Sequence, residues 1–480
     1  MKVTTVAAAI FAALPFAAMA QVATPVWQYQ HPNVLGVGQL SSEIAAYDAE
    51  RGALWVVGGP GIQVLTWAAG TVTASASISC TGAGTPNSIA IRAGLVAATF
   101  NAVAPAVNGT LCLFDAESRE LLQTITVGAT PDMVVFTQNG QHLLVANEAE
   151  RIRGGSPVVE IADPPGTVTI IPMKGKQPQV TRIVTIGFPA SLPGIRTAPG
   201  RTATNDIEPE YITTSKDSKT AWVTLQENNA IAEIDIRAGT LTRVTSLGTK
   251  SYNSDVNAID PLDNDGAGPL RAVAVRSLYQ PDSIADYRAA DGNVYLVMAN
   301  EGDARSDDSD VNRASIVYPA LSTTDERRRL NISTLDSTGG DDLVGIGARS
   351  FSIRTTAGEL VYDSGKILDQ KALDLGIYAD SRSDDKGVEP EGVALAKMGD
   401  RTIAFIGMER PTISAVAMFD ITDPLQVQFI DFIVGSATNL GSNKNDVSPE
   451  GLTVFERDGV LHLAVSHEVS HTTTVYQITP

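Results

Sequence analysis

The sequence predicts an all-β fold, a seven-bladed β-propeller with long inserted loops on one rim, formed as a single domain by residues 21–480. Short β-rich runs with a period of two recur along the chain, as at Leu54–Val57, Ala221–Thr224 and Leu461–Val465. Convincing amphipathic helices are scarce. A further observation is decisive for the blade number, because one unit repeats seven times.

Each repeat begins with Pro and a polar residue, continues as two apolar strands joined by a turn, and ends with a polar residue and Glu. Six copies begin at Pro86, Pro131, Pro209, Pro281, Pro390 and Pro449, and a degenerate seventh begins at Ser42. Seven four-stranded units of about 45 residues leave room for insertions. We expect these near residues 151–205, 240–280 and 301–348, where Gly, Pro, Asp and Ser cluster.

The two ends of the chain predict export and ring closure. Lys2, the apolar run after it and Ala18-Met19-Ala20 indicate a signal peptide over residues 1–20. No later run has the roughly 18 apolar residues of a spanning helix, so we expect no transmembrane segment in the mature chain and a periplasmic or secreted protein. A strand around residues 26–29 should close the ring against residues 473–478.

Two cysteines, Cys80 and Cys112, lie on neighbouring strand-like segments. In an oxidising compartment they either pair as a disulfide or stay two buried thiols.

The charge balance indicates which partners the protein takes. Asp and Glu number 54 against 35 Lys and Arg, which gives a formal net charge of −19. This charge disfavours nucleic acid and anionic membrane surfaces as partners and favours cations.

Acidic residues recur where the repeat places them together. The first strand of a propeller blade lines the channel and the second runs antiparallel beside it, so the start of one lies next to the end of the other. The acids at both positions should therefore meet at one channel mouth. The candidate metal ligands are Glu208, Glu210, Glu227, Asp282, Glu301, Asp303, Glu389, Glu391, Glu409, Glu450 and Glu468.

So many carboxylates at one mouth require compensation. Oxygen-rich sites attract divalent cations, so we expect Ca²⁺, with room for a second metal. Alternatively, basic residues in the same motifs pair with the acids or bind an anion, and the candidates are Arg305, Arg349, Arg382 and Arg410. A purely structural reading, in which the acids only shape turns, stays open.

Two motifs resemble known metal sites but lack their geometry. His467-Glu468-Val469-Ser470-His471 matches the zinc-protease pattern, yet its flanks are β-rich and an extended chain separates the two His by about 13 Å. The stretch Asp255–Gly266 lacks the first and last ligands of an EF-hand, which leaves a cation loop of another geometry or a solvated turn.

Several segments, in order along the chain, resemble the choice-of-anchor I family, which includes a mesenchyme-specific cell-surface glycoprotein of biomineralising cells, and more distantly the YVTN-type propellers. They are Asn205–Tyr211, Met298–Arg305, Gly347–Ile353, Arg382–Gly392, Ala404–Arg410 and Ser448–Leu452. The resemblance implies an extracytoplasmic propeller. Some relatives are called atypical alkaline phosphatases, which implies phosphoester hydrolysis as an alternative activity.

Three functions therefore follow as hypotheses. The first is an exported propeller that binds divalent cations at its acidic mouth and acts as a binding or surface-associated module. The second is a metal-dependent phosphoesterase at the same mouth, for which the sequence nominates no catalytic residue. The third is a protein-interaction platform that uses the inserted loops to bind a cell-surface ligand.

Overall fold

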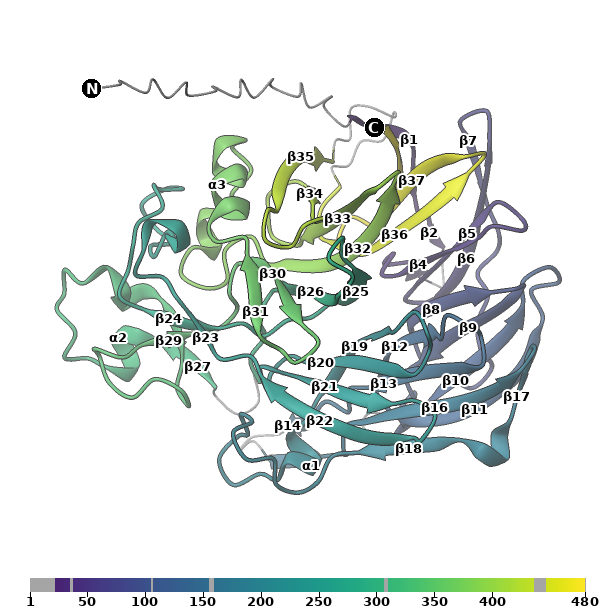
Figure 1. Ribbon diagram of the computed structural model, residues 1–480, viewed down its shortest axis with the longest axis horizontal. Coiled ribbons are helices and arrows are strands. Elements are labelled where there is room, and N and C mark those ends of the chain that lie inside the picture. The colour runs from purple at the N-terminus through teal and green to yellow at the C-terminus, as the bar shows by residue number, and fades with distance from the viewer. Residues whose placement is uncertain are drawn as a thin grey trace, which may run out of the picture.

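Seven antiparallel β-sheets surround one axis in the computed structural model (Figure 1). The structure describes residues 22–34, 38–104, 107–154, 159–305, 310–435 and 446–479, so the predicted signal peptide lies outside the described residues. The innermost strand of each sheet contacts the innermost strand of the next, and the last of them contacts the first. This closed ring is the predicted β-propeller.

The first four blades use consecutive strands, written here from the axis outward. Their bounds are β4 Ala45–Asp48, β5 Ala53–Gly58, β6 Gly61–Ala68 and β7 Thr71–Ala74; β8 Pro86–Arg92, β9 Leu95–Phe100, β10 Asn108–Asp115 and β11 Leu121–Ala129; β12 Pro131–Phe136, β13 His142–Asn147 and β16 Thr167–Lys174, with β17 Gln177–Pro178 and β18 Val184–Gly187 both paired to β16; and β19 Pro209–Thr214, β20 Thr220–Leu225, β21 Ala230–Asp235 and β22 Thr240–Ser246.

The remaining three blades follow the same order. Their bounds are β25 Ile284–Arg288, β26 Val294–Asn300, β30 Ser350–Thr355 and β31 Leu360–Asp363; β32 Pro390–Met398, β33 Arg401–Met408, β34 Ala415–Asp420 and β35 Gln428–Val434; and β36 Pro449–Arg457, β37 Val460–His467, β38 Thr472–Thr479 and β1 Val22–Gln30.

Hydrophobic side chains between adjacent sheets hold the blades together. All six residues of β5 and of β9 are buried, as expected of strands that are covered on both faces. Trp55, Phe100 and Phe114 belong to one buried cluster formed by the first two blades. The apolar runs recognised in the sequence are therefore the central strands of blades.

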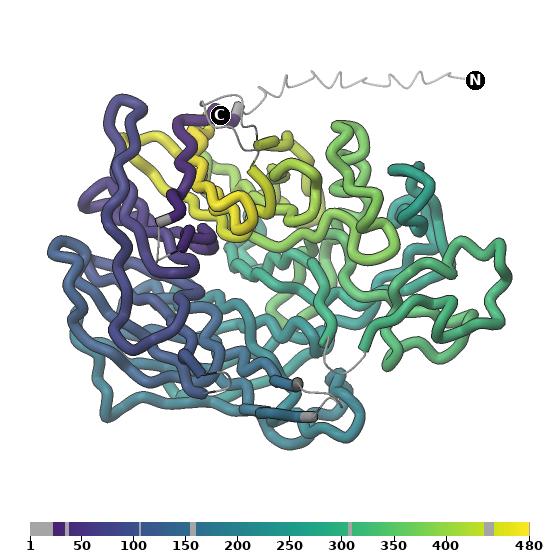
Figure 2. The backbone as a smooth tube through the Cα atoms, turned by 180° about the vertical axis from the view of Figure 1, so that it is seen from behind, coloured from purple at the N-terminus to yellow at the C-terminus, as the bar shows by residue number. Residues whose placement is uncertain are grey.

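The N-terminal strand closes the ring, as predicted. β1 pairs antiparallel with β38, with Trp27 opposite Val475. Trp27 is only 1% exposed and its ring lies 5.2 Å from that of Trp67 in the first blade. Figure 2 shows this junction from behind, where the purple N-terminal and yellow C-terminal segments lie side by side.

The insertions occur in the connections from second to third strand and from one blade to the next. Because the strands alternate in direction, these connections open on one rim, the rim where the repeat acids lie. They contain β14 Ile152–Gly154, β15 Val159–Ala162, α1 Ala203–Asp206, β23 Thr249–Ser251, η2 Asp255–Asn257, β24 Arg276–Leu278, β27 Val311–Arg313, α2 Ala314–Val317, η4 Glu326–Arg329, β28 Asn331–Ser333, β29 Val344–Gly345, α3 Ile367–Asp374 and η5 Asp380–Arg382. The part with β23, β24, β27, β29 and α2 lies outside the ring in Figure 1.

The insertion bounds differ from the prediction in two places. The range 151–205 contains β16, β17 and β18, which belong to a blade, so its inserted parts are the two flanking segments. A further insertion, which contains α3 and η5, lies between β31 and β32 and was not expected.

Smaller elements complete the description: β2 Asn33–Val34 pairs with β3 Gly38–Gln39, and the 3₁₀ helix η1 spans Val180–Arg182. Cys80 and Cys112 form a disulfide, with their Cα atoms 6.4 Å apart. Within the described ranges, no helix combines the length and apolar character that crossing a membrane would require.

Candidate cation site at the channel mouth

Acids from several blades line a cavity of about 270 Å³ at the insertion-bearing end of the channel. Glu43, Asp132, Asp282, Glu450 and Glu468 are among its lining residues. Each is at the start of an innermost strand or the end of a second strand, because the antiparallel pairing places those positions together; Pro449, for example, pairs with His467. The structure thus brings together repeat acids that are up to about 400 residues apart in sequence.

Crowding and loss of water raise the pKa values of these acids. Burial is the largest cause in each case, and for most of them the charge of neighbouring carboxylates adds to it. The pKa rises to about 6 for Asp132, to about 7 for Glu43 and Asp303 and to about 8 for Glu409. It rises well above the usual range for Glu148, Glu208, Glu210, Asp282, Glu391 and Glu450.

Two groups of three acids at the mouth have carboxylate oxygens close enough to share one ion. In the first group, Asp282, Glu301 and Glu391 place one oxygen each within 4.8 Å of the others. In the second, Glu301, Glu389 and Glu409 do the same. Glu301, which follows β26, belongs to both groups.

The second group already has cationic partners. Lys386 Nζ lies 2.7 Å from Glu301 Oε1 and 2.9 Å from Glu389 Oε2. Arg382 Nε lies 2.6 Å from Glu389 Oε1, and Arg410 Nη1 lies 2.8 Å from Glu409 Oε1. Burial by itself raises the pKa of Glu389, but the Lys386 and Arg382 charges lower it below its usual range.

The first group is not compensated in the same way. Asp282 and Glu391 form no ion pair with Lys, Arg or His among the described residues. Glu391 is only 9% exposed, and its Oε2 atom is buried without a hydrogen-bond partner in the described part of the chain. A buried carboxylate oxygen without a partner is costly, so this group is the one with unused ligand capacity.

Local backbone geometry fixes Glu301 and Glu389. Gly302 and Gly347 cross so closely that a Cβ on Gly302 would lie 2.3 Å from the Gly347 Cα, and the Gly302 carbonyl accepts a hydrogen bond from Lys386. Glu389 has a φ of 52°, in the left-handed region that favours glycine. Its cationic partners help to hold that conformation.

The other predicted ligands lie around these two groups. Glu208 lies beside Glu227, and Glu208 Oε2 is 3.7 Å from Arg305 Nε. Glu210 is buried near Glu148 and Asp132. Asp303 lines a second cavity next to the mouth.

The four Arg residues that we considered as anion ligands occupy different environments. Arg382 and Arg410 keep 30% and 40% of their side chains exposed. Arg305 is buried beside Asp206. Arg349 is also buried, donates to the carbonyls of Ser383 and Asp385 at 2.6 and 2.9 Å, and lies 3.6 Å from Asp369.

The geometry therefore argues against Arg349 as an anion ligand. Its donors are used to hold the turn that carries Arg382 and Lys386, and no surface of it is open to an incoming group.

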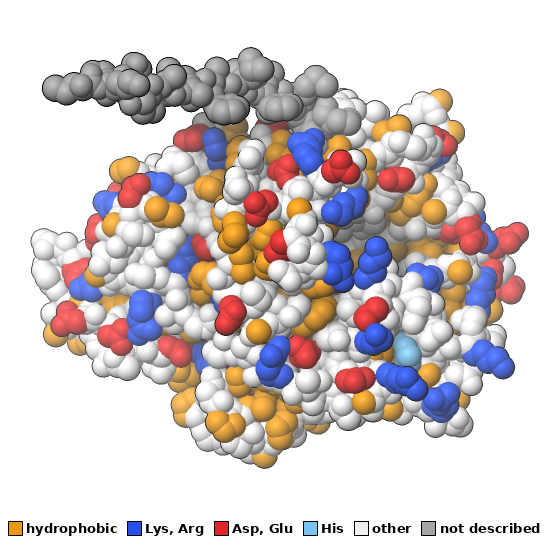
Figure 3. All heavy atoms as spheres, viewed as in Figure 1, with side chains coloured by type: hydrophobic (Ala, Val, Ile, Leu, Met, Phe, Trp, Pro, Cys, Tyr) orange, Lys and Arg blue, Asp and Glu red, His pale blue; other side chains and the backbone are white. Residues whose placement is uncertain are grey.

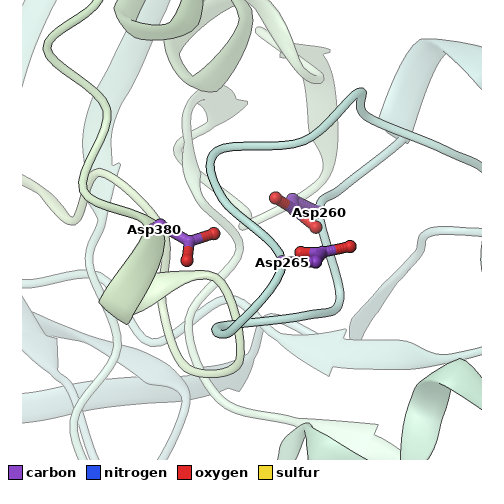
Figure 4. Close-up of side chains that lie close together, drawn as sticks. All are labelled: Asp260, Asp265 and Asp380. Atoms are coloured by element: carbon purple, nitrogen blue, oxygen red, sulfur yellow. The ribbon is translucent and has the colours of Figure 1, made fainter.

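Another acidic group lies in the insertion after β22, as the Asp255–Gly266 stretch suggested. Figure 4 shows the carboxylates of Asp260 and Asp265 facing Asp380 of η5. Asp260 is fully buried but already accepts hydrogen bonds from the Gly268 and Leu262 backbone. Asp265 is exposed, so this group has less need of a cation than the channel group.

The zinc-protease pattern does not form a zinc site. His467 ends β37 and His471 lies in the turn before β38, so no helix presents the two rings together. His467 Nε2 instead lies 2.8 Å from Ser414 Oγ inside the protein.

Sequence reasoning missed Glu43, which lines the mouth. It occupies the acid position of the degenerate first repeat, where Ser42 replaces Pro, so an alignment of the copies could have found it. Lys386 was expected only as one of several compensating charges, because its loop belongs to no repeat.

The face in Figure 3 carries acidic and basic side chains side by side, without one continuous acidic area. Comparison with solved structures finds propellers of low sequence identity. A chain of the mitotic checkpoint complex is 9% identical, with a TM-score of 0.48, over 99% of this chain and all of that one. Hydrazine synthase of Kuenenia stuttgartiensis is 13% identical, with a TM-score of 0.48, over 91% and 96%. The β-propeller domain of Cps50 (Swd1) from Myceliophteria thermophila is 7% identical, with a TM-score of 0.49, over 95% and 100%.

Comparison by sequence identifies the family. Gigasin-3a of Magallana gigas is 33% identical over 160 residues, which are 30% of this chain and 54% of that protein, so the chain spans about half the length of this curated relative. The model of the choice-of-anchor I domain matches residues 43–424, from the first repeat acid into the sixth blade. The chain thus belongs to the choice-of-anchor I domain family, as its motifs predicted.

Proposed function

We propose that this protein is an exported propeller module that binds Ca²⁺ at its channel mouth, between Asp282, Glu301 and Glu391. Membership of the choice-of-anchor I family supports a surface-associated module. The observation that carries the cation is the combination of three convergent carboxylates and a buried Glu391 oxygen without a partner among described residues.

The chemistry of the ligands favours a hard cation. All three are carboxylates, which suit Ca²⁺ and Mg²⁺ better than metals that prefer His or Cys. Ca²⁺ accepts irregular sets of six to eight oxygens at about 2.3–2.6 Å, whereas Mg²⁺ needs a near-ideal octahedron. Carboxylates from three different blades form an irregular set, so Ca²⁺ fits better.

Titration calorimetry of the chelator-stripped protein with CaCl₂ tests the proposal. We expect Glu391→Gln to weaken Ca²⁺ binding by at least about 10-fold, because it keeps the shape and removes the charge. Glu117→Gln, at an exposed position outside the channel, is the matched control and should bind as the parent does. Equal affinities for parent and Glu391→Gln would reject the site.

A second candidate is a metal-dependent phosphoesterase at the same mouth. It is favoured by the half-exposed guanidinium groups of Arg382 and Arg410 beside the acids, because phosphoryl transfer uses metal and Arg together to stabilise charge on phosphate oxygens.

Hydrolysis of p-nitrophenyl phosphate with added Ca²⁺ or Mg²⁺ tests this activity. Arg410→Ala should lower kcat/KM by about 10-fold or more, since it removes one charge-stabilising group. Exposed Arg237→Ala is the control. Undiminished turnover in Arg410→Ala would exclude the assignment.

A further inference from the structure

A second cavity, of about 360 Å³, lies beside the mouth. It is formed by the insertion between β26 and β30 and by the segment that follows α3. Arg305, Asp310, Asn331 and Asp385 are among its lining residues. Its size is within the range of about 300–1,000 Å³ that small-molecule sites occupy.

Two oppositely charged residues of this cavity are buried with unused hydrogen-bonding atoms. The Arg305 side chain is 2% exposed, and its Nη1 has no hydrogen-bond partner among the described residues. Asp310 is fully buried, and within the same described part of the chain its Oδ2 also has none. Buried polar atoms are nearly always satisfied by protein, water or ligand, so two unsatisfied atoms in one cavity point to a missing partner.

The charges of both residues are nevertheless already balanced. Arg305 Nη2 lies 3.3 Å from Asp206 Oδ2, and Arg305 Nε lies 3.7 Å from Glu208 Oε2. Asp310 Oδ1 lies 2.5 Å from Arg196 Nη2. What the cavity lacks is therefore an acceptor for Arg305 and a donor for Asp310, and not a further charge.

The rest of the lining agrees with a neutral occupant. Three basic residues, Arg305, Arg382 and Lys386, are matched by three acids, Asp303, Asp310 and Asp385. A phosphate group would face those carboxylates at close range, which is unfavourable.

Asn331 adds one more polar group. Within the described part of the chain its side-chain amide makes no hydrogen bond, so it offers both a donor and an acceptor. Val311 and Ile346 provide apolar surface beside it.

We propose that this cavity binds a neutral polyhydroxylated ligand, a sugar unit of a glycan. A hydroxyl group accepts from Arg305 and donates to Asp310 at the same time, and a neighbouring hydroxyl meets the Asn331 amide. The apolar ring face of the sugar packs on Val311 and Ile346. This site is separate from the Asp282–Glu301–Glu391 group and does not depend on a bound cation.

The test is a binding titration of the full mature chain, followed by saturation-transfer NMR and calorimetry. The probes are the methyl glycosides of glucose, galactose, mannose and N-acetylglucosamine, and inorganic phosphate, each with chelator and again with Ca²⁺. We expect saturable binding of at least one glycoside in the millimolar range, with or without Ca²⁺. Phosphate should not displace it.

Asn331→Ala is the main variant, because the amide supports no other described group and the fold should be retained. It should weaken the glycoside by about 10-fold or more, the effect of losing good hydrogen bonds in a closed site. Asp310→Asn should do the same if it folds, and exposed Asn108→Ala is the matched control.

Three results would overturn the proposal: no saturable binding of any glycoside, glycoside binding that Asn331→Ala leaves unchanged, or phosphate binding that Arg305→Lys abolishes. The Ca²⁺ titration of Glu391→Gln is independent of all three, so failure here is distinguishable from failure of the cation site.

Discussion

Lys386 Nζ lies 2.7 Å from Glu301 Oε1, so the acidic mouth contains its own cation. This ammonium group, with Arg382 and Arg410, neutralises the Glu301–Glu389–Glu409 group. It leaves Asp282 and Glu391 without a basic partner among the described residues. The mouth is thus divided into a part closed by internal ion pairs and a part open to a bound ion.

Replacing Lys386 should convert the closed part into the open kind. In Lys386→Met, Glu301 and Glu389 lose a buried partner, and such losses typically cost about 3–5 kcal/mol. We expect the free energy of unfolding in chelator to fall by that order, and Ca²⁺ to recover more of it than in the parent. Denaturant unfolding with and without Ca²⁺ measures both.

The control for this experiment is Lys219→Met, which removes an exposed Lys with 76% of its side chain accessible. It should change stability little, because exposed ion pairs contribute about 0–1 kcal/mol. If Lys386→Met were as stable as this control, the Lys386 ammonium would not be the counter-ion that its geometry indicates.

The raised pKa values predict how stability depends on pH. A carboxyl whose pKa is higher in the folded state binds more protons when folded, so its contribution to stability is lost as pH rises through the folded pKa. For Asp303 and Glu43 that value is about 7, and for Glu409 it is about 8. Below pH 6.5 buried His31, with a pKa lowered to about 4, acts in the opposite direction.

The window between pH 6.5 and 8 therefore isolates the acids. We expect the Tm of the chelated protein to fall across it and Ca²⁺ to reduce that fall, because the ion replaces protons at the mouth. Scanning calorimetry at several pH values measures the slope, and Glu409→Gln should flatten it. A Tm that rises with pH in chelator would show that the acids do not take up protons on folding.

Arg349 gives a prediction that separates structure from binding. Its guanidinium holds the carbonyls of Ser383 and Asp385, and a Lys cannot reproduce that planar set of donors. Arg349→Lys should therefore lose about 1–3 kcal/mol of stability, the cost of unsatisfied buried groups. Calorimetry should find Ca²⁺ affinity within about threefold of the parent, and a larger loss would assign Arg349 a role in binding.

Much of this molecule follows from the repeat. The Pro-acid start and the terminal Glu recur at fixed positions, and antiparallel pairing alone brings them to one end of the channel. The N-terminal strand was predictable for the same reason, since a ring of identical units must close on itself.

What the repeat does not encode could not be predicted. Lys386 and Asp310 lie in insertions that have no counterpart in other blades, and their partners are fixed by tertiary contacts across more than 80 residues of sequence. The degenerate first copy hid Glu43. Arg349 looked like an anion ligand because sequence reveals the charge of a side chain but not whether its donors are already used.

The closure of the ring predicts a final effect on stability. A propeller avoids exposed sheet edges only if its first and last segments pair, and here Trp27 both lies opposite Val475 on β38 and packs on Trp67. Trp27→Ala should therefore cost about 3–5 kcal/mol, as for other large buried aromatic side chains, and lower the midpoint of denaturant unfolding. Leu425→Ala, whose side chain is 76% exposed, is the control and should change little. Because the lost contacts are far from Glu391, the folded variant should keep its Ca²⁺ affinity; reduced affinity at unchanged stability would mean that closure shapes the mouth itself rather than only holding the ring together.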